Sequence, residues 1–373
     1  GIDLAYVHAV KEGTAYCLAL ELGLDCDPCT EPFNFEIPKI TYDDIHVSPL
    51  YVMDYSGGGK GLPRIKYKWE NLKTDPLYTI KAIDSWTSDI AFTKDENYII
   101  ASGGYFEEKS GLKKYNIKTG KLVHTYHGHE EQVETIAISQ NGAYMISTDQ
   151  TGRVIIWDLT SNKAIHKFDD AHTHWVEGVC FSHNNKYAAS ASRDGYIKIW
   201  NINNGELVRN FKNNFEIVSS ISFSRDNKKL IVGGIGVKDE VCIYNLPTGK
   251  IISSYDLHTR WSKYIDTHPG GKIFISAGDD DKNIKVVNTE IQEVNTEAGS
   301  PYGATVKACF DPTGKYIAVA AMWGIYVWDI NIGSVIFRAK PNEYPIESIA
   351  FSMSGNYLAA CGRDAEVYIW KIR

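Results

Sequence analysis

One stretch of the chain, residues 171–201, contains the residue types of a hydrolytic triad. His172 is followed by Ser190 after 18 residues and by Asp194 after 22. A serine activated by a histidine that an aspartate orients is the arrangement that cleaves acyl groups. The Gly-x-Ser-x-Gly nucleophile elbow of such enzymes is absent, and related sets recur in neighbouring stretches. This recurrence favours a structural role, and we predict no catalytic residues and no catalytic centre in this chain.

Two further stretches suggest ligand chemistry at first sight. Gly57-Gly58-Gly59-Lys60-Gly61 is rich in glycine and contains a lysine, but Leu-Pro follows where a phosphate-binding loop requires Lys-Ser/Thr and a helix. Asp279-Asp280-Asp281-Lys282 offers oxygen ligands for calcium without the spacing of a known calcium loop. We interpret the first as a flexible turn and the second as a solvated turn, so no bound cofactor or metal is expected.

Three of the seven cysteines, Cys17, Cys26 and Cys29, lie close together near the N-terminus. The Cys26-x-x-Cys29 pair is compatible with a disulfide, half a zinc site or two free thiols. No second pair follows at zinc-ligand spacing, so we favour a disulfide, which would imply an exported protein. Thr30 replaces the histidine of a haem-attachment motif. The other four cysteines lie in apolar strand positions and are expected to be small buried residues: Cys180, Cys242, Cys309 and Cys361.

Composition restricts the class of protein. The 373 residues are 43% hydrophobic with a formal net charge of −7, which argues against a nucleic-acid-binding surface. No apolar run approaches the roughly 18 residues of a membrane span. The sequence begins at Gly1 without Met, as expected of a processed mature chain.

A repeat organises most of the sequence. Each unit has three short apolar stretches joined by polar turns, and too few strands to be stable alone. The third stretches end at Tyr115, Trp157, Trp200, Tyr244, Val287, Trp328 and Trp370, at spacings of 42, 43, 44, 43, 41 and 42 residues. Endings such as Trp157-Asp158, Trp200-Asn201 and Trp328-Asp329 resemble those of the WD-repeat family. The resemblance covers residues 77–373 and implies an all-β, seven-bladed β-propeller with four strands in each blade.

The ends of the repeat predict how the ring closes. The chain stops after the third strand of the last unit, leaving an unpaired edge. Leu77–Ile83 has the pattern of an outer strand, and we predict that it pairs there and closes the seventh blade. An eighth blade that includes Trp69-Glu70-Asn71 is the alternative. Residues 1–76 lack the repeat and are predicted to form an irregular N-terminal arm before the propeller at residues 77–373.

The resemblance also implies a hydrogen-bonded network inside each blade. It fits His172, Ser190, Asp194 and Trp200 best, while Thr151 occupies the aspartate position of the unit that contains His129. His258 and Asp281 fit the fifth unit, and Asp364 and Trp370 fit the last.

Departures from the repeat are candidates for partner contact. The loop between the second and third strands is long in units one and four, and Met322-Trp323 replaces Arg-Asp in unit six. An exposed aromatic side chain there would be an interface anchor, unless Trp323 plugs the channel or caps its own blade. The candidates are Tyr105, Phe106, Glu107, Glu108, Trp175, Lys238, Asp239, Glu240, Trp261, Met322 and Trp323.

A narrower resemblance follows from the N-terminal AYCLALELGLDCDPC segment, the acidic balance and the absence of cofactor motifs. Together with the predicted propeller, these features resemble the β subunits of hydrazine synthases from anammox bacteria. The resemblance implies a non-catalytic subunit beside subunits that carry haem c, in an exported compartment, within a complex that makes hydrazine from nitric oxide and ammonium. An intracellular WD-repeat adaptor is the alternative. A propeller enzyme of the lactonase or quinoprotein type would need converging acid, base or metal-binding residues, which the sequence does not show.

Overall fold

The computed structural model describes residue 69 and residues 72–104, 111–213, 215–236, 240–259, 261–279, 282–290 and 293–373. All of them belong to one unit of the chain, Tyr55–Arg373. The predicted disulfide residues Cys17, Cys26 and Cys29 lie outside the described residues, and so does the predicted arm apart from Trp69 and residues 72–76.

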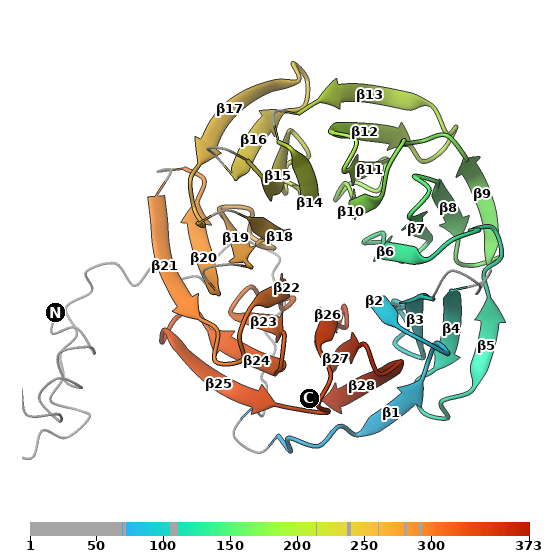
Figure 1. Cartoon of the computed structure of the whole chain (residues 1–373), viewed down its shortest axis with the longest axis vertical. Coiled ribbons are helices and arrows are strands. Elements are labelled where there is room, and N and C mark those ends of the chain that lie inside the picture. Colours follow the sequence, from blue (N-terminus) through green and yellow to red (C-terminus); the bar gives the residue numbers. More distant parts are fainter. Residues whose placement is uncertain are drawn as a thin grey trace, which may run out of the picture. The chain divides into compact units, whose positions relative to one another are not determined.

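The described residues form seven four-stranded antiparallel sheets arranged as a ring (Figure 1). This arrangement confirms the predicted seven-bladed propeller. Blade one consists of β2 (Thr87–Phe92), β3 (Tyr98–Gly103), β4 (Leu112–Asn116) and β5 (Leu122–Thr125). Blade two consists of β6 (Val133–Ile138), β7 (Tyr144–Asp149), β8 (Val154–Asp158) and β9 (Lys163–Phe168). Blade three consists of β10 (Val176–Phe181), β11 (Tyr187–Ser192), β12 (Tyr196–Asn201) and β13 (Leu207–Lys212).

The next three blades follow the same order from the centre outwards. Blade four consists of β14 (Ile217–Phe223), β15 (Lys229–Ile235), β16 (Val241–Asn245) and β17 (Lys250–Tyr255). Blade five consists of β18 (Ser262–Thr267), β19 (Ile273–Gly278), β20 (Asn283–Asn288) and β21 (Glu293–Gly299). Blade six consists of β22 (Thr305–Phe310), β23 (Tyr316–Ala321), β24 (Gly324–Asp329) and β25 (Ser334–Ala339).

The seventh blade joins the two ends of the described chain. It consists of β26 (Ile346–Phe351), β27 (Tyr357–Gly362), β28 (Glu366–Lys371) and β1 (Tyr78–Lys81). Tyr78 lies opposite Ile369, and Lys81 lies opposite Glu366. The predicted closure by an N-terminal outer strand is therefore confirmed, and β1 covers the edge that β28 would otherwise expose.

The eight-bladed alternative is wrong. The buried Trp69 ring packs against blades six and seven, with its centroid 5.5 Å from that of Tyr316 and 5.9 Å from that of Phe337. Its indole fills space between existing blades, so it adds apolar packing and no further strand.

Residue size decides where each strand lies within a blade. The second strands are almost wholly buried and rich in small residues, as in β11, where Ala188, Ala189 and Ala191 have no exposed surface. Small side chains allow the neighbouring blades to approach closely on both faces of the sheet. The outer strands alternate less strictly and remain largely exposed, as in β13.

The turns between the first and second strands share one pattern of side-chain hydrogen bonds. In blade three, the Ser182 hydroxyl accepts a hydrogen bond from the Tyr187 amide at 2.9 Å and donates to the Asn184 side chain at 2.7 Å. Asn185 then adopts a left-handed φ of 56°, which asparagine and glycine tolerate best. The sequence signal for these turns is therefore a serine followed by asparagine or glycine.

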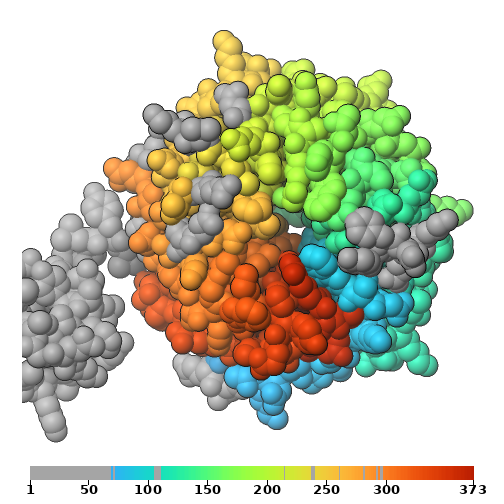
Figure 2. All heavy atoms as spheres, in the orientation of Figure 1, coloured from blue at the N-terminus to red at the C-terminus, as the bar shows by residue number. Residues whose placement is uncertain are grey.

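The meander gives the ring two different faces. The turns from first to second strand and from third to fourth strand lie on one face, which we call the turn face. The loops from second to third strand and the connections between blades lie on the other, which we call the connection face. Figure 2 shows a hollow at the centre of the ring. Among the described residues, no helix is long and apolar enough to cross a membrane.

Candidate functional site

The triad-like residues of blade three form one buried network. The Trp200 indole N–H donates to the Ser190 hydroxyl at 3.1 Å, and the His172 Nε2 lies 2.9 Å from that hydroxyl. The His172 Nδ1 lies 3.0 Å from Asp194. Ser190 is fully buried, so no substrate reaches its oxygen. The arrangement ties β11 and β12 to the loops that contain His172 and Asp194 instead of presenting a nucleophile.

Asp194 shows how strongly the network favours its charged form. Burial alone would raise the pKa of this carboxyl, but the hydrogen bond and charge of His172 and the backbone N–H groups of Tyr196 and Thr173 outweigh it. The pKa of Asp194 therefore falls to about 2.

Blade two builds the same network with a different acid. The His129 Nδ1 lies 2.7 Å from the Asp149 carboxylate, and its Nε2 lies 2.6 Å from the Ser147 hydroxyl. Thr151, which occupies the aspartate position in the sequence, donates its hydroxyl to Asp149 at 2.5 Å. Sequence alignment to blade three missed Asp149 because it lies at the end of β7, two residues before the turn position.

The networks of blades five and seven differ from those of blades two and three in their described contacts. In blade five, His258 Nε2 lies 2.8 Å from the Ser276 hydroxyl, and Asp281 lies outside the described residues. In blade seven, Asn342 replaces the histidine and donates to Asp364, while the Trp370 indole donates to the backbone oxygen of Thr74 at 2.9 Å. The Trp370 contact joins the last blade to the segment that leads into β1.

A cavity of about 270 Å³ opens at the centre of the connection face. Two stacked pairs of tryptophan and arginine lie beside it, with the Arg363 guanidinium 4.3 Å from the Trp86 ring and that of Arg193 4.4 Å from the Trp175 ring. Each arginine Nε also donates to a glutamate of its own blade, Arg193 to Glu177 at 2.5 Å and Arg363 to Glu347 at 2.6 Å. Aromatic and arginine side chains together are typical of protein contact sites.

Glu134 occupies the corresponding position of blade two but has a neutral partner, the Gln150 amide at 2.5 Å. Burial, aided by the nearby charge of Glu177, raises the pKa of Glu134 to about 7, although Gln150, Arg193 and Lys263 oppose the shift. Burial also raises the pKa of Glu347. The negative charge at the opening of this cavity, which we call the mouth, therefore varies near neutral pH.

Met322 and Trp323 lie on the connection face with 38% and 46% of their surfaces exposed. The Trp323 amide donates to the Tyr302 carbonyl at 3.1 Å, which fixes the loop while the indole remains accessible. Trp323 does not line the cavity of the connection face, and it does not line a second cavity that opens at the centre of the turn face. It is therefore not a channel plug.

The other contact candidates differ in accessibility. Trp175 is half-buried beside the mouth, and the Trp261 ring lies 4.1 Å from the Lys263 ammonium. Glu240 must be withdrawn as a contact residue, because it is buried and its carboxylate accepts the Leu257 amide at 3.0 Å. The remaining candidates lie outside the described residues: Tyr105, Phe106, Glu107, Glu108, Lys238 and Asp239.

No group of three or more histidine, cysteine, aspartate or glutamate side chains is placed to hold a metal ion in the described part of the chain. The four described cysteines, Cys180, Cys242, Cys309 and Cys361, form no disulfide with one another. Burial raises the pKa of the Cys309 thiol to about 12, so this sulfur remains protonated and a poor nucleophile.

Comparison with known families agrees with this architecture. Residues 123–297 match the NWD2 C-terminal beta-propeller, and residues 335–371 match the WD domain, G-beta repeat. The chain is a WD-repeat β-propeller. It is also similar to Pre-mRNA-processing factor 19 of Oryza sativa subsp. japonica, with 26% identity over 131 residues. That alignment covers 34% of this chain and 25% of the relative, so the chain spans only a quarter of that protein's length.

Proposed function

We propose that this WD-repeat propeller is a non-catalytic scaffold that binds a protein partner on its connection face. The proposal rests on two exposed aromatic side chains, one in blade six and one in the connection that follows this blade. Trp323 is 46% exposed and Tyr344 is 57% exposed, and both lie in loops of the connection face. Large apolar side chains gain most when a partner removes them from water.

The nearby mouth supports the same face as the binding surface. Its arginine–glutamate pairs and stacked tryptophans are held by their own blades, so a partner meets a preorganised surface. A preorganised surface loses less conformational entropy on binding. WD-repeat propellers commonly bind protein partners, which fits this assignment.

A narrower proposal concerns the complex. The N-terminal cysteine segment and the acidic composition support a subunit of an exported redox assembly like hydrazine synthase, with haem c in its partner subunits. Native purification followed by mass spectrometry of co-purifying chains and haem absorbance tests this assignment. A partner-free monomer would contradict any role as a complex subunit. Partners without haem would contradict the redox version alone.

The second candidate is an intracellular adaptor, which the similarity to Pre-mRNA-processing factor 19 favours over one third of the chain. The oxidation state of Cys26 and Cys29 separates the two candidates. Mapping these cysteines after thiol blocking in native extracts should show a disulfide in the exported subunit and two blocked thiols in the adaptor.

The contact face is tested with Trp323→Ala. The variant should fold, because the indole is exposed, and should lose at least tenfold in affinity for the co-purifying partner. Ile332→Ala is the matched control, since Ile332 is 56% exposed in a third-to-fourth-strand turn on the opposite face. Equal binding by both variants would exclude Trp323 as an anchor, and unfolding of Trp323→Ala would show that the indole supports its blade.

A further inference from the structure

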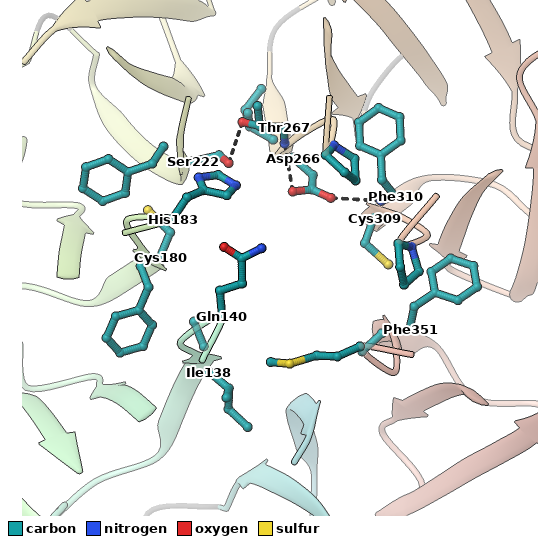
Figure 3. A pocket seen from close by; sticks show the side chains of 18 of the residues that line it. Ile138, Gln140, Cys180, His183, Ser222, Asp266, Thr267, Cys309, Phe310 and Phe351 are labelled. Atoms are coloured by element: carbon teal, nitrogen blue, oxygen red, sulfur yellow. Dashed lines mark hydrogen bonds between the residues drawn. The ribbon is translucent and has the colours of Figure 1, made fainter. Parts of the chain in front are cut away.

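A second, larger cavity of about 630 Å³ opens on the turn face, opposite the proposed contact surface (Figure 3). Its volume lies in the range of about 300–1,000 Å³ that small-molecule sites occupy. Aromatic side chains such as Phe310 and Phe351 form part of its wall, and Gln140 and His183 reach into it from the turns of blades two and three.

One residue in this cavity departs from the repeat of the ring. Six of the seven innermost strands carry a small neutral residue at the equivalent position, whereas β18 carries Asp266. The six are Ala91, Ala137, Cys180, Ser222, Cys309 and Ala350. A charge at this position is not needed to build a blade, because the other six blades form without one.

The Asp266 carboxylate is held in a fixed orientation. One oxygen accepts the Thr267 amide at 2.8 Å, and the other accepts the Phe310 amide of the next blade at 2.9 Å. Lys307 also lines this cavity, but its ammonium is bound to Asp89 at 2.5 Å. Among the described residues, Asp266 thus has no ion pair of its own. Burial raises its pKa to about 6, with the two amides and Lys307 opposing the shift.

The rim of the cavity has the opposite charge. Lys94 and Arg225 lie in the turns of blades one and four and line the opening. The Arg225 Nη1 donates to the Gln140 side chain at 3.4 Å, which leaves the other guanidinium nitrogen for a ligand. Asp311, the acidic residue on the rim, is engaged within its own turn, where it accepts the Tyr316 amide at 2.7 Å.

We infer that the turn-face cavity binds a small zwitterion, with its ammonium at Asp266 and its carboxylate at Arg225 and Lys94. A simple amine would meet the two rim cations on entry, and a simple carboxylate would meet Asp266 at depth. A molecule that carries both charges satisfies both ends of the cavity. A buried carboxylate gains most from a cation that replaces its lost hydration.

The test uses the full chain and three ω-amino acids of increasing length: glycine, 4-aminobutyrate and 6-aminohexanoate. Butylamine and butyrate are the one-charge controls. We expect at least one amino acid to bind by calorimetry at pH 7.5, at least tenfold more tightly than either one-charge control. Binding should weaken below pH 6, where Asp266 becomes protonated.

Variants separate the two ends of the site. Asp266→Asn removes the charge but keeps only one of the two acceptor oxygens, and it should reduce amino-acid affinity at least tenfold. Arg225→Gln lies on the exposed rim and should weaken the amino acid while improving or preserving butylamine binding. Arg209→Gln removes an exposed arginine from outer strand β13 and is the matched control.

Two outcomes would overturn the inference. One is the absence of binding by all three amino acids. The other is unchanged amino-acid affinity in Asp266→Asn or Arg225→Gln, each with its thermal unfolding checked against the parent chain. If Asp266→Asn does not fold, Arg225→Gln still decides the question, because the Arg225 side chain is exposed.

Discussion

The Lys307 ammonium lies 2.5 Å from the Asp89 carboxylate, and this ion pair joins blade six to blade one. Ser348 of blade seven donates to the same carboxylate at 2.6 Å, and Thr135 of blade two donates to it at 2.9 Å. Side chains from three other blades therefore meet at the buried Asp89. They lie between the two cavities, because Lys307 and Tyr264 line both.

Lys307→Met should destabilise the propeller by about 3–5 kcal/mol, since it leaves the Asp89 carboxylate buried without its cation. Urea unfolding at pH 7 measures the loss. Lys340→Met, which removes an exposed partner of Glu343, is the control and should cost less than about 1 kcal/mol. Similar values for the two variants would show that the channel ion pair contributes no more than a surface pair.

The double variant Lys307→Met/Asp89→Asn isolates the pairing itself. Removing both charges should cost less than the sum of the two single changes, because no unpaired ion then remains in the channel. Strict additivity in urea unfolding would mean that the two residues act independently.

The sequence repeat allowed the ring of blades to be predicted, but it did not predict the side-chain contacts between blades. Spacing of the Trp/Tyr endings gave the number of blades, and the missing outer strand gave the closure by β1. Asp89, Lys307 and Asp266 have no sequence neighbours that mark them, since each lies in an ordinary apolar strand. Their relation depends on the closed ring, which brings β2 and β22 together although more than 200 residues separate them, as in the Lys307–Asp89 contact.

The second-blade network allows a test of which residue is the acid. Asp149→Ala should destabilise the chain by about 1–3 kcal/mol, because the buried His129 ring loses its partner. Thr151→Ala removes only a hydroxyl that donates to the same carboxylate, so its effect should be smaller. Thermal unfolding of the two variants at pH 7 compares them. A larger effect at Thr151 would restore the assignment that sequence alignment suggests.

Glu134 should make stability depend on pH. Because its pKa is raised from 4.5 to about 7, the folded chain binds its proton more tightly, and this contribution to stability declines as pH rises from about 4.5 to 7. Glu134→Gln removes this dependence. The variant should therefore be more stable than the parent at pH 8, with the difference shrinking towards pH 5. Glu293→Gln, at an exposed position of β21, should show no such trend.

Closure of the ring by β1 is tested within one short strand. Ile80 is 3% exposed and packs into the apolar cluster between blades seven and one, whereas the neighbouring Thr79 is exposed on the other side of the strand. Ile80→Asp places a charge in that cluster and should open the seventh blade, lowering the thermal midpoint by at least 10 °C, since such changes cost several kcal/mol. Thr79→Asp alters the same strand with little effect. Hydrogen exchange should then show loss of protection at β28, whose edge β1 covers, before any loss in blades three and four. Equal midpoints for the two variants, or uniform exchange across all blades in Ile80→Asp, would contradict closure by β1 as the element that holds the ring together.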